Sequence, residues 1–323
     1  MIRLEDIRRP VADEFRQFER EFECALATDN PLLKEVLSVI LARRGKQLRP
    51  LLVLLSAGLC HGINEKTIQT AVALELMHTA SLIHDDVVDG SDTRRGLPSV
   101  NARWNNKIAV LAGDYLLSRV VAILAELRNV RILGIVSDMG KALSEGELLE
   151  LHNREDMWIT EKEYFRIIER KTACLFAACM QAGAVSSGAS MRQETALTCF
   201  GEELGMCFQM QDDILDYSDS EELGKPTMGD IRDGKVTLPL LISLKRASKQ
   251  EAQHIISLTQ RDMDFAIENE IKSFVLRYDG IRYAQQRMRE HRDAALAALS
   301  VFRNNRITEA MQQLLEHSVN RVN

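Results

Sequence analysis

The feature that most constrains the fold of this 323-residue chain is a long interval without proline. The chain has six prolines, and none lies between Pro98 and Pro226. Because proline breaks helix interiors, this interval can hold several long helices. Apolar residues recur at helical spacing through most of the chain, whereas the alternation with β-branched residues that is typical of strands is nearly absent. The sequence therefore predicts an all-α fold.

Helical periodicity and capping signals divide the chain into expected helices. We predict helices at about 3–27, 31–44, 48–61, 64–90, 106–127, 130–153, 160–188, 191–217 and 235–247, with several more after residue 249. Thr160 and Glu163 form a capping box at the start of one of them. No linker or low-complexity tract separates these segments. We therefore expect residues 1–323 to form a single domain.

Composition and charge exclude several classes of protein. The chain carries a net charge of −6, which gives no basic footprint for nucleic acid. None of its six cysteines forms a CxxC pair, so they are expected to be reduced, as in a cytoplasmic protein. The N-terminal residues lack the apolar core of a secretion signal. Apolar stretches such as Leu51–Leu55 are too short to span a bilayer, which leaves room only for a peripheral membrane contact.

Two copies of one acidic motif indicate the chemistry. Residues 85–89 and 212–216 both read DDxxD, 127 residues apart, and each copy ends an apolar, helix-like run. Positions four apart share a helix face, so Asp85 pairs with Asp89, and Asp212 with Asp216. Like charges at this spacing destabilise a helix unless a cation lies between them. Carboxylates combined with substrate phosphates suit Mg²⁺, so we expect two carboxylate walls facing a diphosphate.

One such motif alone would be a weak signal, because acidic clusters at helix ends are usually solvated faces or caps. Two copies, each fused to an apolar run and each followed by basic residues, favour the metal-binding interpretation. Asp86 and Asp213 occupy the second position of each copy.

Cations and polar residues accompany both acidic copies. Lys46 and Arg49 lie within one turn of each other, His78 lies two turns before Asp85, and Arg94 and Arg95 follow the first copy. Arginine offers a fork to phosphate oxygens and lysine a point charge. The alternative is an ordinary basic surface, and for His78 a hydrogen-bonded core histidine.

A second group of candidates surrounds the second acidic copy. Lys171 and Thr172 lie mid-helix where the sequence becomes small and apolar, Gln209 precedes Asp212, and Lys225 and Lys235 lie in the loop that follows. Lysine is poor core material, so a cation and a hydroxyl facing a phosphate make sense here. For the two loop lysines, ordinary solvated charge stays open as the alternative.

These residues show that the chain resembles the trans-isoprenyl diphosphate synthases, most closely the long-chain polyprenyl (octaprenyl-type) synthases. The resemblance rests on GKQLRP at 45–50, HTASLIHDDVVDGSDTRRG at 78–96, GDYL at 113–116, the Lys171–Thr172 pair, FQMQDDILDY at 208–217, and the LGKP and DGKVTLPL segments that follow. It implies an isoprenoid synthase-type helical bundle around a deep central cavity, Mg²⁺ dependence and usually a homodimer.

The resemblance also implies individual roles. Asp85 and Asp89, with Asp86 adjacent, would bind Mg²⁺ from one wall, and Asp212, with Asp213 and Asp216, from the other. Isopentenyl diphosphate would be held by Lys46, Arg49, His78 and Arg95. The allylic diphosphate would be held by Arg94, Lys171, Thr172 and Gln209, assisted by Lys225 and Lys235. Two departures stand out: Gln47, where many relatives have arginine, and Glu150, where they often have glutamine.

The expected activity is sequential condensation of isopentenyl diphosphate onto an allylic prenyl diphosphate, giving a long-chain all-trans polyprenyl diphosphate that serves as a quinone side-chain precursor. Ala80 and Ser81 lie about one turn before Asp85, with Met77 below them, and small side chains there would leave a tunnel open for a long product. The alternatives are a class I terpene cyclase or head-to-head synthase, and a non-catalytic subunit of a heteromeric prenyl synthase. The complete isopentenyl diphosphate set argues against the first two, and the six retained aspartates argue against the third.

Overall fold

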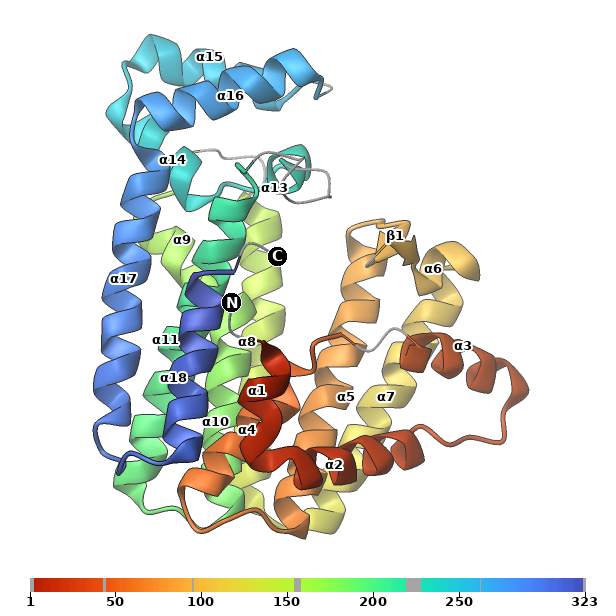
Figure 1. Cartoon of the computed structure of the whole chain (residues 1–323). Coiled ribbons are helices and arrows are strands. Elements are labelled where there is room, and N and C mark those ends of the chain that lie inside the picture. Colours follow the sequence, from red (N-terminus) through yellow and green to blue (C-terminus); the bar gives the residue numbers. More distant parts are fainter. Residues whose placement is uncertain are drawn as a thin grey trace.

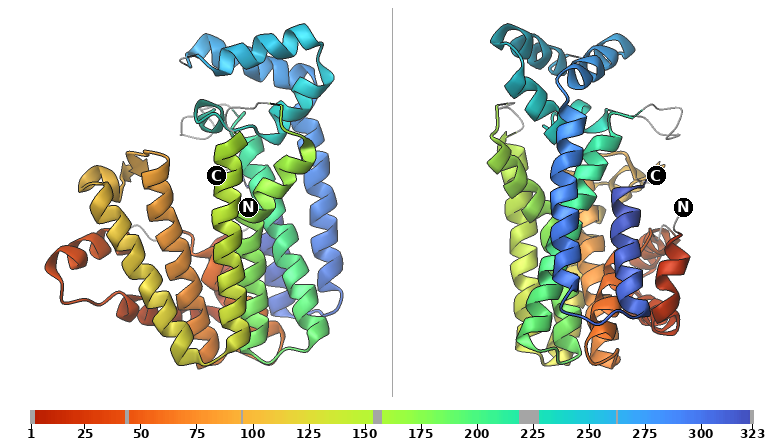
Figure 2. Two further views of the ribbon diagram at one scale, coloured as in Figure 1. Left: turned by 180° about the vertical axis from the view of Figure 1, so that it is seen from behind. Right: turned by 60° about the vertical axis from the view of Figure 1, so that its left-hand side comes forward.

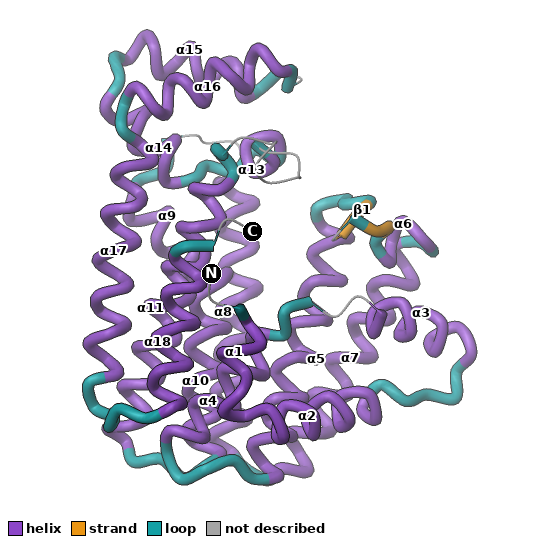
Figure 3. Tube along the Cα trace, in the orientation of Figure 1, coloured by secondary structure: helices purple, strands orange, loops and turns teal. Residues whose placement is uncertain are grey.

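Helices dominate the structure, a computed structural model that describes residues 3–42, 45–94, 96–153, 158–218, 228–261 and 263–321 (Figure 3). Within these ranges the strands are β1 (Thr93–Arg94) and β2 (Leu97–Pro98), which pair as one short antiparallel hairpin. The prediction of an all-α fold is confirmed. The hairpin was not predicted, because two-residue strands leave no periodic signal.

Four short helical pieces begin the chain: α1 (Leu4–Arg8), the 3₁₀ turn η1 (Arg9–Val11), α2 (Ala12–Ala25) and α3 (Pro31–Ala42). The prediction of one helix over 3–27 was wrong at its start. Pro10 falls in the first positions of η1, where its missing N–H costs least, and it divides α1 from α2. Phe15, Phe18 and Phe22 then bury one face of α2.

A bundle of long helices forms the body of the molecule. Its members are α4 (Leu48–Leu59), α5 (Glu65–Val88), α7 (Asn106–Leu127), α8 (Val130–Asn153), α10 (Cys174–Ser186), α11 (Met191–Leu215), α17 (Gly280–Leu299) and α18 (Arg306–Val319). They run roughly along one axis (Figures 1 and 2). α5 packs on α7, and α11 packs on α10 and α17. The expected helix over 160–188 is continuous but changes type, from α9 (Glu161–Ile168) through the π-helical turn η2 (Glu169–Ala173) to α10.

The remaining helices are short and lie at one end of the bundle. They are α6 (Val100–Arg103), α13 (Gly229–Arg232), α14 (Leu238–Arg246), α15 (Lys249–Thr259) and α16 (Phe265–Arg277). α13 to α16 share a second, smaller apolar core that includes Tyr217, Met228 and Phe274. In Figure 1 this group lies beyond the upper ends of α11 and α17, and α5 also ends on the upper side of the molecule, beside β1. The two acidic copies therefore lie at the same end of the molecule.

One helix contradicts the expectation that every apolar stretch is too short for a membrane. Within the described residues, α7 is long and apolar enough to cross a bilayer, with a mean hydropathy of 1.9 over its most apolar window. Only 39% of that window is buried. One face packs on α5, where Gly113 lets the His84 ring approach, while Val110, Leu111 and Val121 lie exposed. α7 therefore carries apolar side chains that are not buried by packing within this chain.

Candidate active site

A cavity of about 790 Å³ lies among α5, α8, η2 and α11. Asp85 and Asp212 line it from α5 and α11, so the structure brings the first aspartate of each acidic copy to one space. The predicted diphosphate ligands Arg49, His78, Arg94, Lys171, Thr172 and Gln209 line the same cavity. Its apolar wall includes Met77, Leu117, Leu143 and Leu175. The lining of the cavity thus combines charged groups with hydrocarbon side chains.

The first acidic copy uses its aspartates differently. The pKa of Asp85 is raised to about 6: burial is the main cause and the Glu147 carboxylate adds to it, while Lys171 and Arg94 act in the opposite direction. Asp86 points away from the large cavity, is buried, and accepts a 2.5 Å hydrogen bond from Nε of Arg94. Asp89 is the C-cap of α5, and its charge also raises the pKa of Asp85. Asp85 is therefore the member of this copy that faces the cavity.

The second copy presents Asp212 to the cavity, but a cation already contacts it. Arg321, near the C-terminus, forms an ion pair with Asp212. The same guanidinium donates a 3.0 Å hydrogen bond to the Phe208 carbonyl and lies 3.9 Å from the centre of the Phe208 ring. Sequence reasoning missed Arg321, because a single arginine at the end of a chain carries no motif.

The other two aspartates of the second copy are anchored inside the protein. Asp213 accepts hydrogen bonds from the Tyr164 hydroxyl at 2.6 Å, the Gln209 amide at 3.0 Å and the Leu238 backbone N–H at 3.4 Å. Its pKa is raised to about 7, mainly by burial and also by the Asp230 carboxylate, although the three hydrogen bonds act in the opposite direction. The expectation that Asp213 helps to hold metal is at odds with this geometry, because both carboxylate oxygens are engaged elsewhere.

Asp216 is likewise turned away from the large cavity. Its carboxylate accepts hydrogen bonds from the backbone N–H groups of Gly229 at 2.9 Å and Asp230 at 3.2 Å, where α13 begins. Burial raises its pKa to about 6, and the Asp230 carboxylate acts in the same direction. Asp212 and Asp216 were predicted to share one helix face, but only Asp212 lines the cavity. Helix spacing placed both side chains correctly along α11 but could not show what each one meets.

Lys171 lies in the π-helical turn, and two glycines let neighbouring helices approach that turn closely. A Cβ on Gly146 of α8 would lie 2.9 Å from the Lys171 backbone nitrogen, and one on Gly205 of α11 would lie 2.5 Å from Cα of Ala173. π-helical turns occur often at functional sites. The turn is thus clamped between α8 and α11, and its side chains are presented to the cavity from a rigid base.

The Lys171 ammonium is balanced by two carboxylates of α8. It lies 2.8 Å from Glu147 and also pairs with Glu150, the residue at which this chain departs from the resembling family. Burial lowers the pKa of Lys171, but Glu150 and Glu147 outweigh burial, and the net shift is upward. Lys171 is therefore charged and held at the cavity wall.

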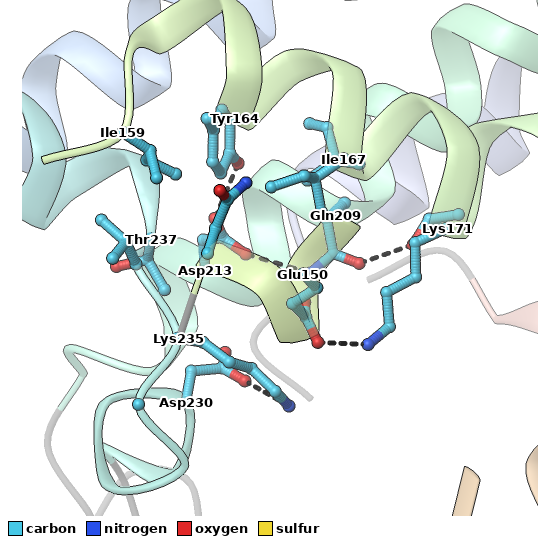
Figure 4. A pocket seen from close by; sticks show the side chains of 15 residues that line it. Glu150, Ile159, Tyr164, Ile167, Lys171, Gln209, Asp213, Asp230, Lys235 and Thr237 are labelled. Carbon is cyan, nitrogen blue, oxygen red and sulfur yellow. Dashed lines mark hydrogen bonds and ion pairs between the residues drawn. The ribbon is translucent and has the colours of Figure 1, made fainter. Parts of the chain in front are cut away.

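A second pocket of about 170 Å³ adjoins the cavity (Figure 4). Thr172 and Gln209 line both spaces, and Lys235, with Asp230, lines only the smaller one. Lys235 lies 3.4 Å from Asp230. Burial lowers the pKa of Lys235, but Asp230 and Glu150 raise it by more. Lys235 is thus a charged lysine beside the site.

The remaining predicted diphosphate ligands are Lys46, Arg95 and Lys225. Arg95 and Lys225 lie outside the described residues. Lys46 precedes α4, and its carbonyl accepts a hydrogen bond from Arg8, but it is not among the described residues that line the cavity. Gln47, where many members of the resembling family have arginine, is buried and has a left-handed backbone (φ 49°) immediately before α4.

The residues expected to set product length are divided. Met77 and Ser81 line the cavity, whereas Ala80 is fully buried and is not among the lining residues. The methyl carbon of Met77 lies against Gly140 of α8, where a Cβ would come within 2.6 Å of it. Of the two neighbours Ala80 and Ser81, the structure therefore presents Ser81 to the cavity and packs Ala80 into the core.

The carboxylates of Asp85 and Asp212 fit a hard divalent cation whose remaining ligands come from a bound diphosphate. The described residues contain no ready cluster of three metal-ligating side chains. Asp85 and Asp212 nevertheless face one cavity, and the raised pKa of Asp85 marks a buried carboxylate without full compensating charge. Mg²⁺ is bound through one or two carboxylates together with substrate phosphates and water. Two facing aspartates are therefore sufficient protein ligands when a diphosphate supplies the rest.

Comparisons with known proteins agree with this geometry. The family model of Polyprenyl synthetase matches residues 30–275. An octaprenyl diphosphate synthase of Haemophilus influenzae is 33% identical over 99% of this chain and 98% of its own length. A heptaprenyl diphosphate synthase component 2 of Bacillus subtilis is 40% identical over 80% of this chain and 75% of its own length.

Among solved structures, a polyprenyl synthase from Caulobacter crescentus, complexed with calcium and isoprenyl diphosphate, superimposes with a TM-score of 0.92. It is 32% identical, and the match covers 99% of this chain and 98% of that one. The isoprenoid synthase-type fold and the resemblance noted from the motifs are thereby confirmed. The chain belongs to the polyprenyl synthetase family of prenyltransferases.

Proposed function

We propose that this protein is a Mg²⁺-dependent prenyltransferase that condenses isopentenyl diphosphate repeatedly onto an allylic diphosphate and releases a long-chain all-trans polyprenyl diphosphate, a precursor of a quinone side chain. One observation carries the proposal. Asp85, Asp212 and the predicted cationic ligands line a single cavity of about 790 Å³ that continues into apolar walls. The cavity thus joins a diphosphate-binding end to a hydrocarbon-binding part.

The chemistry follows from these side chains. Asp85 and Asp212 would hold Mg²⁺, which supplies neutralisation of the departing diphosphate. Lys171 and Arg94 add positive charge at the same end, and Thr172 and Gln209 add hydrogen-bonding groups. Electrostatic stabilisation of developing charge in a preorganised site is usually the largest contribution to a rate. Arg49 and His78 would orient isopentenyl diphosphate so that its double bond meets the allylic carbon.

The hydrocarbon part of the cavity protects the reaction and accepts the growing chain. Leu117, Leu143 and Leu175 exclude water from the allylic cation. The chain elongates past Ser81 and Met77, neither of which is aromatic. Names of relatives support a long product, since the Haemophilus protein is an octaprenyl diphosphate synthase. The proton lost in each condensation passes to the released diphosphate.

We further propose that the chain works as a homodimer through α7. This helix exposes Val110, Leu111 and Val121 while its opposite face packs on α5. Burying such side chains against a second copy would stabilise association by about 25 cal/mol per Å² of apolar area. A heteromeric assembly is the second candidate, favoured by the likeness to a relative named component 2.

The test uses the purified chain alone. Incubated with isopentenyl diphosphate, an allylic diphosphate and Mg²⁺, it is expected to release diphosphate and form long-chain products that reversed-phase chromatography separates. Chelation of the metal should stop the reaction, and sedimentation should show a dimer. Cyclised or head-to-head products would contradict the proposed reaction, and activity only after adding a second protein would favour the heteromer.

A further inference from the structure

One buried side chain reaches the site although none of the sequence motifs includes it. Tyr164 of α9 is buried, and its hydroxyl donates a 2.6 Å hydrogen bond to Oδ2 of Asp213 (Figure 4). A buried phenol needs a hydrogen-bond partner, which accounts for the bond. The need for a partner does not by itself explain why that partner is Asp213, an aspartate of the second acidic copy.

The hydrogen bonds continue from Asp213 towards the cavity. Oδ1 of Asp213 accepts a 3.0 Å hydrogen bond from the Gln209 amide nitrogen, and the Gln209 amide oxygen accepts one of 2.8 Å from the Thr172 hydroxyl. The carboxylate thus fixes which end of the amide faces Thr172, because only the amide nitrogen can donate to Asp213. Four side chains form one series, Tyr164–Asp213–Gln209–Thr172, from α9 through α11 to η2.

The series has a buried end and a substrate-facing end. Tyr164 and Asp213 line only the smaller pocket, whereas Gln209 and Thr172 line the large cavity as well. Thr172 sits in the π-helical turn that Gly146 and Gly205 hold in close contact with α8 and α11. A disturbance of Asp213 would therefore reach the cavity through the Gln209 amide.

We propose that Tyr164 is a positioning residue for the allylic diphosphate: it holds Asp213, and through Asp213 it orients the Gln209 amide, whose second N–H would donate to that diphosphate. This inference rests on the proposed function. Polar groups held ready in the binding geometry lose less freedom when the ligand arrives, so their prior orientation favours binding. Isopentenyl diphosphate, which is assigned to Arg49 and His78, does not depend on this series.

A purely structural role is the competing explanation. Asp213 also accepts the Leu238 N–H at 3.4 Å, so it ties the start of α14 to α11. If Tyr164 served only this tie, removing its hydroxyl would lower stability and affect both substrates alike. Selectivity between the two substrates separates the two explanations.

The test is Tyr164→Phe, which keeps the buried ring and removes one oxygen. We expect KM for the allylic diphosphate to rise about threefold to tenfold, which is at or below the effect of losing one hydrogen bond to a charged group. KM for isopentenyl diphosphate should stay within about twofold. The dissociation constant of an unreactive allylic thiodiphosphate, measured by calorimetry, should rise by the same factor as the allylic KM.

Tyr283→Phe is the matched control. The Tyr283 hydroxyl donates a 2.7 Å hydrogen bond to Glu161, which lies in the first turn of the same helix α9. The same atom is lost in a bond to a carboxylate, but no site residue is involved. This variant should lower Tm by less than Tyr164→Phe, because Tyr283 is only partly buried, and it should leave both KM values unchanged.

A double-mutant cycle tests the route through Gln209. In a Gln209→Ala background, Tyr164→Phe should add less than about twofold to the allylic KM, because residues acting in one network are not additive. Asp213→Asn weakens the same link from the other side and should reproduce the substrate selectivity.

An unchanged allylic KM in Tyr164→Phe, equal shifts for both substrates, or full additivity with Gln209→Ala would each overturn the inference. A wild-type chain that binds the thiodiphosphate but forms no condensation product would overturn the proposed function instead.

Discussion

The two acidic copies are spelled alike but are built into the protein differently. In the first copy, Asp85 faces the cavity and Asp86 pairs with Arg94 from the adjoining hairpin. In the second copy, Asp212 and Asp213 have partners from distant parts of the chain, and Asp216 is held by the segment that follows the motif. Their partners are Arg321, Tyr164 and the start of α13. The first copy is anchored locally, and the second joins four segments of the sequence.

This difference teaches that a repeated motif does not imply repeated roles. Each copy presents one aspartate to the cavity, whereas Asp86, Asp213 and Asp216 bind neighbouring elements of the protein. A carboxylate that accepts several hydrogen bonds from fixed donors cannot turn towards a metal without breaking them, and each such bond is worth about 1.5–3 kcal/mol. We therefore expect Asp213 and Asp216 to serve the geometry of the site, and Asp85 and Asp212 to serve its chemistry.

The largest expected effect comes from removing the two cavity-facing charges. Asp85→Asn and Asp212→Asn should each lower kcat by at least ~10²-fold, because each removes a carboxylate that would hold the Mg²⁺ by which the departing diphosphate is neutralised. Steady-state kinetics at saturating Mg²⁺ measure the loss, and exposed Asp13→Asn on α2 serves as the control. Near-normal turnover in either cavity variant would break the comparison.

Arg49 and Lys171 test whether the two walls serve different substrates. Arg49→Ala should raise KM for isopentenyl diphosphate by roughly tenfold or more, and Lys171→Ala should do so for the allylic diphosphate, since one charged hydrogen bond is worth about 1.5–3 kcal/mol. Lys245→Ala, a lysine outside the cavity, should change neither. If both substrates weaken equally in both variants, the partition is wrong.

Product length distinguishes two neighbouring residues of α5. Ser81→Phe should fill the cavity below Asp85 and shift products to shorter chains, because Ser81 lines the wall. Ala80→Tyr should instead destabilise the fold by about 1–3 kcal/mol through overpacking, because Ala80 is fully buried. Chromatography of the products and thermal unfolding give the two readouts. Wild-type chain lengths from Ser81→Phe would show that the tail takes another path.

The smallest expected effect concerns the cation that contacts Asp212. Arg321→Gln removes the guanidinium that pairs with this carboxylate and competes with the metal for it. Because such an ion pair is worth about 1 kcal/mol, Mg²⁺ should bind about threefold to tenfold more tightly. Calorimetric titration of Mg²⁺ in the presence of diphosphate measures it. Arg131→Gln, which breaks a comparable pair with Glu194, is the control and should leave metal affinity unchanged.

Much of the fold was readable from the sequence, because helices depend on periodicity and caps that lie close together in the chain. The capping box at Thr160 forms as expected, and α7 and α8 end within a residue of their predicted bounds. The break at Pro10 was missed although its cause is local. The π-helical turn was missed because it depends on close approach by Gly146 and Gly205 from other helices.

The sequence by itself determined the class of fold, the family and the set of charged residues from which a diphosphate site can be built, since motif spelling and helical spacing are local properties. Only the tertiary structure decided which of these residues meet. It turned Asp213 towards Tyr164, placed Arg321 on Asp212, and chose Ser81 over Ala80 for the cavity wall. The physical reason is that the side chain across a cavity or helix interface comes from a segment tens to hundreds of residues away, and packing selects it.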